Sequence, residues 1–250
     1  MATARPARGT CTALRVAFTL TLAASGCSSG KVSVGDDRLV DAGPFEAGAN
    51  APSAASLLPL VASCSAASAI SDGALAPESG RAADVFVCGL SNAVFWRSEF
   101  AVDCDGKITT TCNGQTDPQS QPNTVGKDSA GNSLDPTLVP YVEVPAPSAV
   151  FDYHAAGLSM GSVAAVIYKD QLAYGVLGQE QAAGVIGAGS YKLAELLGID
   201  PDPVKGGLES EVVTYIAFTG ASHVVPALQD ESTIDSTAEM AARDLIATGH

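Results

Sequence analysis

The chain has 250 residues, of which 46% are hydrophobic and 16% charged, so it is long enough for one sizeable domain or two small ones. This composition excludes a collagen-like, coiled-coil or wholly disordered protein. Thirteen basic residues against 27 acidic ones give a net charge of −14. We therefore expect no nucleic-acid partner, because phosphates would be repelled, and neutral or cationic partners fit better.

The first 27 residues have the pattern of a lipoprotein-type export signal. Arginines without acids precede an apolar stretch at residues 16–24, which is much shorter than the ~20 residues of a membrane-spanning helix. Small residues directly before Cys27 resemble a bacterial lipobox, so we expect a lipidated Cys27, with simple cleavage or a retained anchor as alternatives. This predicts a cell-envelope lipoprotein or a secreted protein, with membrane contact only through the lipid. Without residues 1–26 the net charge would be −17.

The exported part divides into a tether and one domain. Residues 28–53 are rich in Ala, Gly, Ser and Asp and predict a flexible tether, because they bury too little surface to offset chain entropy. The domain is predicted over residues 54–228 and starts with a short helix before Cys64. Further on, the pattern predicts strands at 85–87 and 93–96, turns at 105–106 and 113–114, and a long surface loop at 115–132.

The second half of the domain carries the clearest secondary-structure signals. Residues 163–168 and 172–177 are apolar and separated by a polar turn, so they predict a β-hairpin after a short strand at 141–144. A helix is predicted after Ser190 and ends at Gly198. A last core strand is expected at 212–218, followed by an acidic, Ala-rich C-terminal tail at 229–250 with a weak helix from about residue 237. The fold class is therefore mainly β, with a few short helices.

Four cysteines of the expected domain predict two disulfides, since an exported chain with an even number of cysteines favours pairing. Of three connectivities we favour Cys104 with Cys112, which closes a tight loop, and Cys64 with Cys88, which links the first helix to the first strand. A zinc site is the alternative, but the spacings lack paired CxxC units. We expect neither a metal nor a cofactor.

Other motifs compete for a catalytic role. Gly157–Gly161 matches G-x-S-x-G, and Asp200 or Asp202 with His223 would complete a serine-hydrolase order. However, a nucleophile elbow needs a preceding strand and a following helix, so we interpret the segment as a turn into the hairpin. His154, His223 and His250 are too dispersed for a metal site and are expected in loops.

Asp103-Cys104-Asp105-Gly106 places two carboxylates around a half-cystine. The segment favours a structural turn. A calcium loop would want further acidic ligands at alternate positions, whereas Lys107 and Ile108 follow, so calcium remains a weaker alternative beside substrate contact.

Several segments carry a resemblance to a known family: Phe95–Gly106, Pro140–Pro145, Phe151–Tyr153, Val163–Tyr168 and Val213–Gly220. In this order they resemble glycoside hydrolase family 75, the endo-chitosanases, over about residues 54–225. The resemblance implies chitosan or glucosamine oligomers as substrate, and we expect a monomer. The hairpin and the following Gly-Ser helix start are also similar to a double-psi β-barrel, which is the expected fold.

The resemblance also implies two catalytic carboxylates, one in a Gly-Asp turn after the hairpin and one in a Gly-Glu-x-Ser helix start. Here those positions hold Gln179 and Ala188, so the expected acid and base are both missing. A one-residue slip of the turn would bring in Glu180, and Asp103 or Asp105 would be the other relocated carboxylate. Glu143 and Asp152 are fallback acids that we interpret as surface charges.

We therefore predict a chitosan-directed member of this family with impaired hydrolysis and retained polysaccharide binding. The expected substrate contacts are Asp103, Asp105, Trp96 and Ser190, and the acidic surface would attract a polymer of protonated amines. One alternative is an active chitosanase that uses relocated carboxylates. The other is an envelope structural or interaction lipoprotein without sugar specificity.

Overall fold

The computed structural model describes residues 51–77 and 80–249. The predicted export signal with Cys27, the predicted tether up to residue 50 and His250 lie outside these residues.

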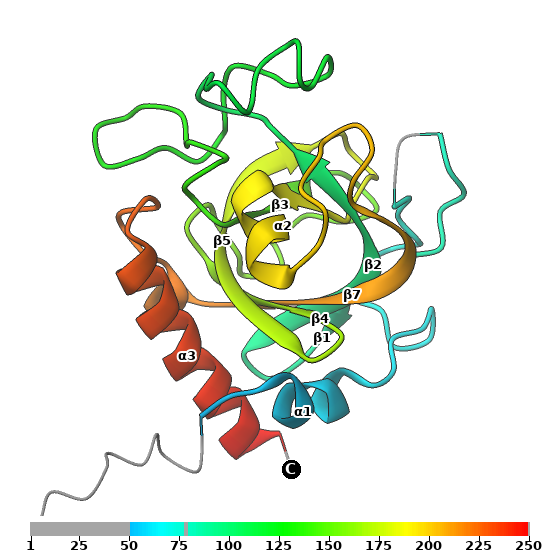
Figure 1. Ribbon diagram of the computed structural model, residues 1–250. Helices are drawn as coiled ribbons and strands as arrows, with labels where there is room; N and C mark the ends of the chain where they lie inside the picture. The colour runs from blue at the N-terminus through cyan, green and yellow to red at the C-terminus, as the bar shows by residue number, and fades with distance from the viewer. Residues whose placement is uncertain (1–50, 78–79, 250) are drawn as a thin grey trace, which may run out of the picture. The chain divides into compact units, whose positions relative to one another are not determined.

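Six strands form a closed β-barrel (Figure 1). In barrel order they are β2 (Ala93–Asp103), β6 (Ala188–Ser190), β3 (Tyr141–Pro145), β5 (Gln171–Gln181), β4 (Val163–Tyr168) and β7 (Leu208–Phe218), and β7 pairs back with β2. The pairs β2–β6 and β3–β5 are parallel, and a two-residue strand β1 (Cys88–Gly89) pairs with β2 outside the ring. Closure removes the free sheet edges that would otherwise invite pairing with other chains. The predicted mainly β class is confirmed.

Alternating residues of the strands fill the inside of the barrel. The interior is apolar and aromatic: Trp96 stacks on Tyr215 with ring centroids 5.1 Å apart, and both side chains are fully buried. The Tyr215 hydroxyl donates a hydrogen bond to the Glu99 carbonyl at 2.8 Å. The barrel is thus closed by packing as well as by its strand ladder.

Helices cover the barrel at different places. The short α2 (Tyr191–Leu197) buries Leu193, Ala194 and Leu197 in the interior cluster. Its N-cap Ser190 accepts from the Leu193 amide, and Gly198 ends it in the left-handed conformation, both as predicted. The pair α1 (Ala54–Leu57) and η1 (Leu58–Val61) forms the predicted first helix, and η2 (Ala221–His223) follows β7.

The C-terminal segment forms the predicted helix, which is longer than expected and packs against the barrel. The helix α3 (Glu231–Thr248) begins six residues earlier than expected, with Asp230 as its N-cap, and lies along β4 and β5 (Figure 1). Its buried face consists of Ile234, Ala238, Ala241, Ala242 and Leu245. Within the described residues, no helix combines the length and the apolar character needed to cross a bilayer.

Some local predictions are confirmed and others are wrong. Both predicted disulfides are present, and β4 and β5 form the predicted hairpin. The strand expected at 85–87 is absent: Val85 makes only an isolated bridge with Leu75. Strand β5 continues to Gln181, so Gln179 lies in a strand and not in a turn, because parallel pairing with β3 extends the strand.

Candidate active site

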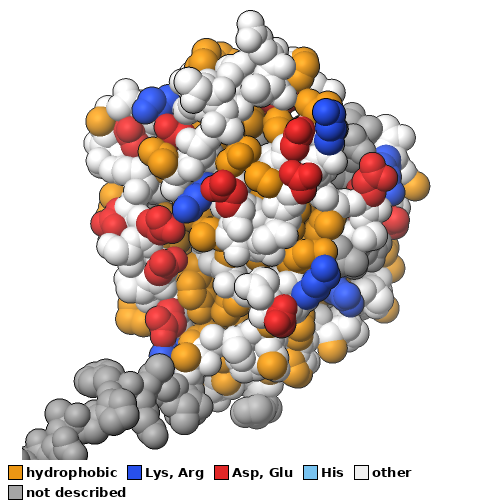
Figure 2. Space-filling model, in the orientation of Figure 1, with side chains coloured by type: hydrophobic (Ala, Val, Ile, Leu, Met, Phe, Trp, Pro, Cys, Tyr) orange, Lys and Arg blue, Asp and Glu red, His pale blue; other side chains and the backbone are white. Residues whose placement is uncertain are grey.

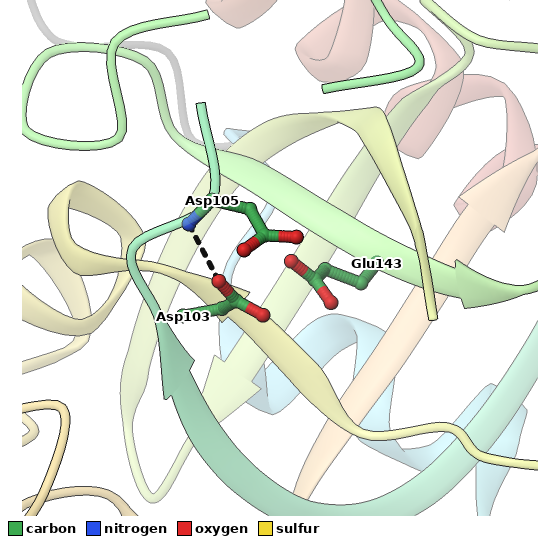
Figure 3. Close-up of side chains that lie close together, drawn as sticks. All are labelled: Asp103, Asp105 and Glu143. Atoms are coloured by element: carbon green, nitrogen blue, oxygen red, sulfur yellow. Dashed lines mark hydrogen bonds between the residues drawn. The ribbon is translucent and has the colours of Figure 1, made fainter. Parts of the chain in front are cut away.

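Three carboxylates from β2, the loop after it and β3 meet at one end of the barrel. Asp103 is the last residue of β2, Asp105 follows in the disulfide loop, and Glu143 lies in β3. One oxygen of each lies within 4.8 Å of the others, and Figure 3 shows the three carboxylates directed toward one another. Asp103 is partly exposed, whereas Asp105 and Glu143 are buried. Glu143, at 1% exposure, is therefore not the predicted surface charge.

The loop after β2 holds the two aspartates in place. An Asp103 carboxylate oxygen accepts a hydrogen bond from the Asp105 amide at 2.6 Å, which tightens the turn. Gly106 has φ of 121°, and a Cβ there would collide with the Leu134 carbonyl, so this position requires glycine. The Tyr141 hydroxyl donates to the Asp105 carbonyl at 2.6 Å and links the loop to β3.

Gln179 connects the cluster to the overlying loop. Its amide nitrogen donates to an Asp105 carboxylate oxygen at 2.6 Å and to the Asn123 carbonyl at 3.2 Å, and its oxygen accepts from the Val125 amide at 2.9 Å. It pairs with Glu143 across the parallel β3–β5 ladder. The side chain is 5% exposed and has no titratable proton in the relevant range.

Ala188 lies in β6, between β2 and β3. The antiparallel pairing of Val142 with Gly189 brings Glu143 next to Ala188 on the adjoining strand. Ala188 is 1% exposed and offers only a methyl group. The two positions that the sequence marked for catalytic carboxylates therefore flank Glu143, one on each neighbouring strand.

Burial and mutual repulsion shift the acids of the cluster. Burial first, and then the negative charge of Asp105, raises the pKa of Asp103 to about 7. Burial, followed by the charges of Asp103 and Asp105, raises the pKa of Glu143 well above its usual range. Raised carboxyl pKa values of this kind are typical of functional sites.

The other predicted site residues lie away from the cluster or serve the fold. Trp96 is fully buried in the barrel, which leaves no ring face for a sugar and argues against substrate contact. The Ser190 hydroxyl is also buried: it donates to the Val139 carbonyl and accepts from the amides of Tyr141 and Leu193. Glu180 points away from Gln179 and accepts from the Tyr153 hydroxyl at 2.7 Å. Asp152 is a surface acid as predicted, 3.4 Å from His154.

The rejected motifs keep structural roles. The Ser159 amide donates to the Ser162 hydroxyl in the turn before β4, and the His223 ring contacts the Thr219 carbonyl at 2.8 Å.

Glu143 is the site residue whose burial was not predicted from the sequence. Its signal was a charged side chain between Val142 and Val144 in an otherwise apolar strand.

Comparison with known proteins places the chain among glycoside hydrolases. The family model described as fungal chitosanase of glycosyl hydrolase group 75 matches residues 100–249. An endo-chitosanase of Aspergillus oryzae (strain ATCC 42149 / RIB 40) is 30% identical over 169 residues, covering 60% of this chain and 69% of the relative. Endo-chitosanase B of Aspergillus oryzae is 32% identical over 134 residues, covering 50% of this chain and 55% of the relative. The family match includes the carboxylate cluster, Gln179 and Ala188.

Proposed function

The chain belongs to the chitosanases of glycosyl hydrolase group 75, and we propose that it binds chitosan or glucosamine oligomers while its hydrolytic activity is impaired. The observation that carries the proposal is the pair Gln179 and Ala188 at the two positions where the family resemblance implies carboxylates. Hydrolysis of a glycosidic bond needs one acid to protonate the leaving oxygen and a second carboxylate as base or nucleophile. Neither an amide nor a methyl group performs these steps.

The remaining carboxylates do not form a replacement pair. One oxygen each of Asp103, Asp105 and Glu143 lies within 4.8 Å of the others, whereas the two carboxyl groups stand roughly 6.5–9.5 Å apart in inverting glycosidases and about 5–5.5 Å apart in retaining ones. Asp105 and Glu143 are also buried. Glu180 is held by Tyr153 on the other side of β5. These contacts leave no carboxylate pair with the spacing and exposure that efficient cleavage needs.

Charge and shape support a cationic sugar polymer as the ligand. Acidic side chains outnumber basic ones on the face shown in Figure 2, including along α3. A pocket of ≈ 680 Å³ lies beside the loop that covers the cluster, and its lining includes the acid Asp128, the ion pair of Asp135 with Lys107 and the exposed Leu138. This volume suits a small sugar unit. An acidic surface also accelerates encounter with a polycation.

The N-terminal pattern extends the proposal to the cell envelope. Residues 1–27 would direct export with Cys27 as the lipid attachment site, and residues 28–53 would tether the domain. An anchored sugar-binding domain of this kind would hold polymer fragments at the membrane surface. Labelling of the expressed protein with a radioactive fatty acid tests the anchor, and Cys27→Ser is expected to abolish the label.

A second candidate function is slow hydrolysis by relocated carboxylates. The observation in its favour is Asp103, which is partly exposed and whose pKa is raised to about 7 by burial and the charge of Asp105. Such a group is suited to general acid catalysis near neutral pH. If this candidate were correct, the unmodified protein would cleave chitosan, and Asp103→Asn would abolish the cleavage.

The deciding experiment measures reducing-end release from soluble chitosan by the purified protein and by Gln179→Asp with Ala188→Glu. We expect the unmodified protein to release no reducing ends and the double variant to release them. The matched control, Gln181→Asp with Ala183→Glu, makes the same chemical changes outside the two positions and should stay silent. Because a glutamate at position 188 would crowd Glu143, the double variant is also made with Glu143→Gln. Cleavage by the unmodified protein would contradict the proposal.

Binding is tested separately by retention on chitosan beads. Retention that survives moderate salt and is reversed by glucosamine oligomers supports a specific site. Retention that disappears with rising salt and is not reversed by glucosamine oligomers would instead favour an envelope interaction protein without sugar specificity.

A further inference from the structure

The carboxylate cluster contains a polar atom that the protein leaves without a partner. Glu143 is only 1% exposed, and its Oε1 atom is buried and accepts no hydrogen bond. Figure 3 shows its carboxylate directed at Asp103 and Asp105. An ionised, buried carboxylate oxygen without a donor is costly, so the pair Glu143 and Asp103 either shares a proton or is neutralised by a cation from outside the protein.

The described residues also supply no cationic partner for these three acids. None of the ion pairs among residues 51–77 and 80–249 includes Asp103, Asp105 or Glu143. Gln179 contributes an amide hydrogen to Asp105, but an amide carries no net charge. Among the described residues, the three acids therefore have one another and neutral donors as partners, including a hydrogen bond between the Asp103 and Glu143 side chains, but no cation.

We propose that Asp103, Asp105 and Glu143 bind one divalent metal ion, and that Ca²⁺ is the best fit. All three ligands are hard oxygen donors, which Ca²⁺ and Mg²⁺ prefer to the nitrogen and sulfur ligands of zinc. Oxygens separated by up to 4.8 Å match positions around an ion with metal–oxygen distances of about 2.4 Å. Mg²⁺, with metal–oxygen distances of about 2.0–2.1 Å, would need the ligand oxygens to lie no more than about 4.2 Å apart.

An ammonium group of the sugar polymer is a poorer occupant of the same position. Glu143 and Asp105 are 1% and 8% exposed, so a bare ion reaches the space between them with less displacement of the surrounding residues than a sugar amine does. A small ion can enter past Asp103, which is the partly exposed member. Calcium was the weaker prediction from the sequence because no further acid follows Asp105 at alternate positions. The third ligand instead comes from another strand, β3.

The test uses purified protein stripped with EGTA and then dialysed free of chelator, at about pH 8. Saturating CaCl2 is expected to raise the Tm by about 5 °C or more, and titration calorimetry to show one site per chain. Tb³⁺ provides an optical probe, because Tyr141 contacts the Asp105 carbonyl and should sensitise Tb³⁺ luminescence when the aromatic residues are excited. Excess Ca²⁺ should quench this signal.

Variants separate a built site from general charge effects. Glu143→Gln should lose the Ca²⁺-dependent Tm shift and the sensitised luminescence, and Asp103→Asn provides a second variant if the first does not fold. Glu195→Gln removes one acid from the exposed side of α2 and should keep both signals. Absence of saturable Ca²⁺ binding, or an equal Tm shift in Glu143→Gln, would overturn the proposal. The test is independent of chitosan binding, so either proposal can fail alone.

Discussion

Two buried regions of the barrel differ sharply in chemistry. On the outer side covered by α3, the packed side chains of β4, β5 and β7 are apolar, among them Val163, Ile167, Val176 and Ile216. At the end where β2, β3 and β5 meet the long loop, the buried residues include Asp105, Glu143 and Gln179. The first region stabilises the fold by removing apolar surface from water. The second destabilises the fold because it buries like charges. An arrangement that reduces stability in this way indicates that the second region serves binding or chemistry.

The largest expected effect lies in the apolar region. Ile234→Ala removes a fully buried side chain of α3 and should lower the free energy of unfolding by about 2–5 kcal/mol, measured by urea denaturation. Met240→Ala, on the exposed side of the same helix, should change it by no more than about 0.5 kcal/mol. Equal losses in both variants would show that α3 does not pack as described.

A smaller effect of opposite sign is expected in the carboxylate region. In metal-free protein at about pH 8, Glu143→Gln should raise the free energy of unfolding by about 1–3 kcal/mol, because it removes a repelling acid and adds a donor for its neighbours. The measurement is chemical denaturation in EGTA. A large destabilisation would mean that the Glu143 carboxylate has a stabilising partner in the metal-free protein.

The pH dependence of the free energy of unfolding reports on the buried charge of the carboxylate region. The pKa of Asp103 is raised from 3.8 to about 7 by burial and by the charge of Asp105, so the folded state holds this proton more tightly than the unfolded state. Its stabilising contribution is full below about pH 4 and is lost as the pH rises through about 7. Metal-free protein should therefore lose stability across this range, and Asp103→Asn should make the decline shallower. An unchanged slope in the variant would assign the decline to other groups.

The smallest effect is expected at a surface acid. Asp152→Asn removes a half-exposed carboxylate that lies near His154, and such surface pairs contribute at most about 1 kcal/mol. Thermal unfolding with and without Ca²⁺ should match the unmodified protein. Because Glu143 and Asp152 had been given the same surface role from sequence, a clear difference between their variants would show that burial, and not residue type, sets the effect.

Local signals in the sequence were sufficient for several elements. The hairpin of β4 and β5 follows from two apolar runs around a polar turn, and α2 follows from its Ser190 cap and Gly198 end. Long-range pairing changed other predictions. The residues at 85–87 form no strand, and parallel pairing with β3 extends β5 to Gln181. Pairing partners distant in sequence decide such boundaries, and local propensity does not encode them.

The sequence by itself determined the mainly β class and the family, and it favoured the two disulfide pairs that the structure contains, because these depend on residue identity, order and local pattern. Only the tertiary structure decided that Trp96 is a core residue and that Glu143 is buried beside Asp103 and Asp105. Burial and the distances between carboxylates arise when β2, β3, β5 and β6 close into one barrel. The pKa of each acid, and its capacity to bind a cation, depend on that closure.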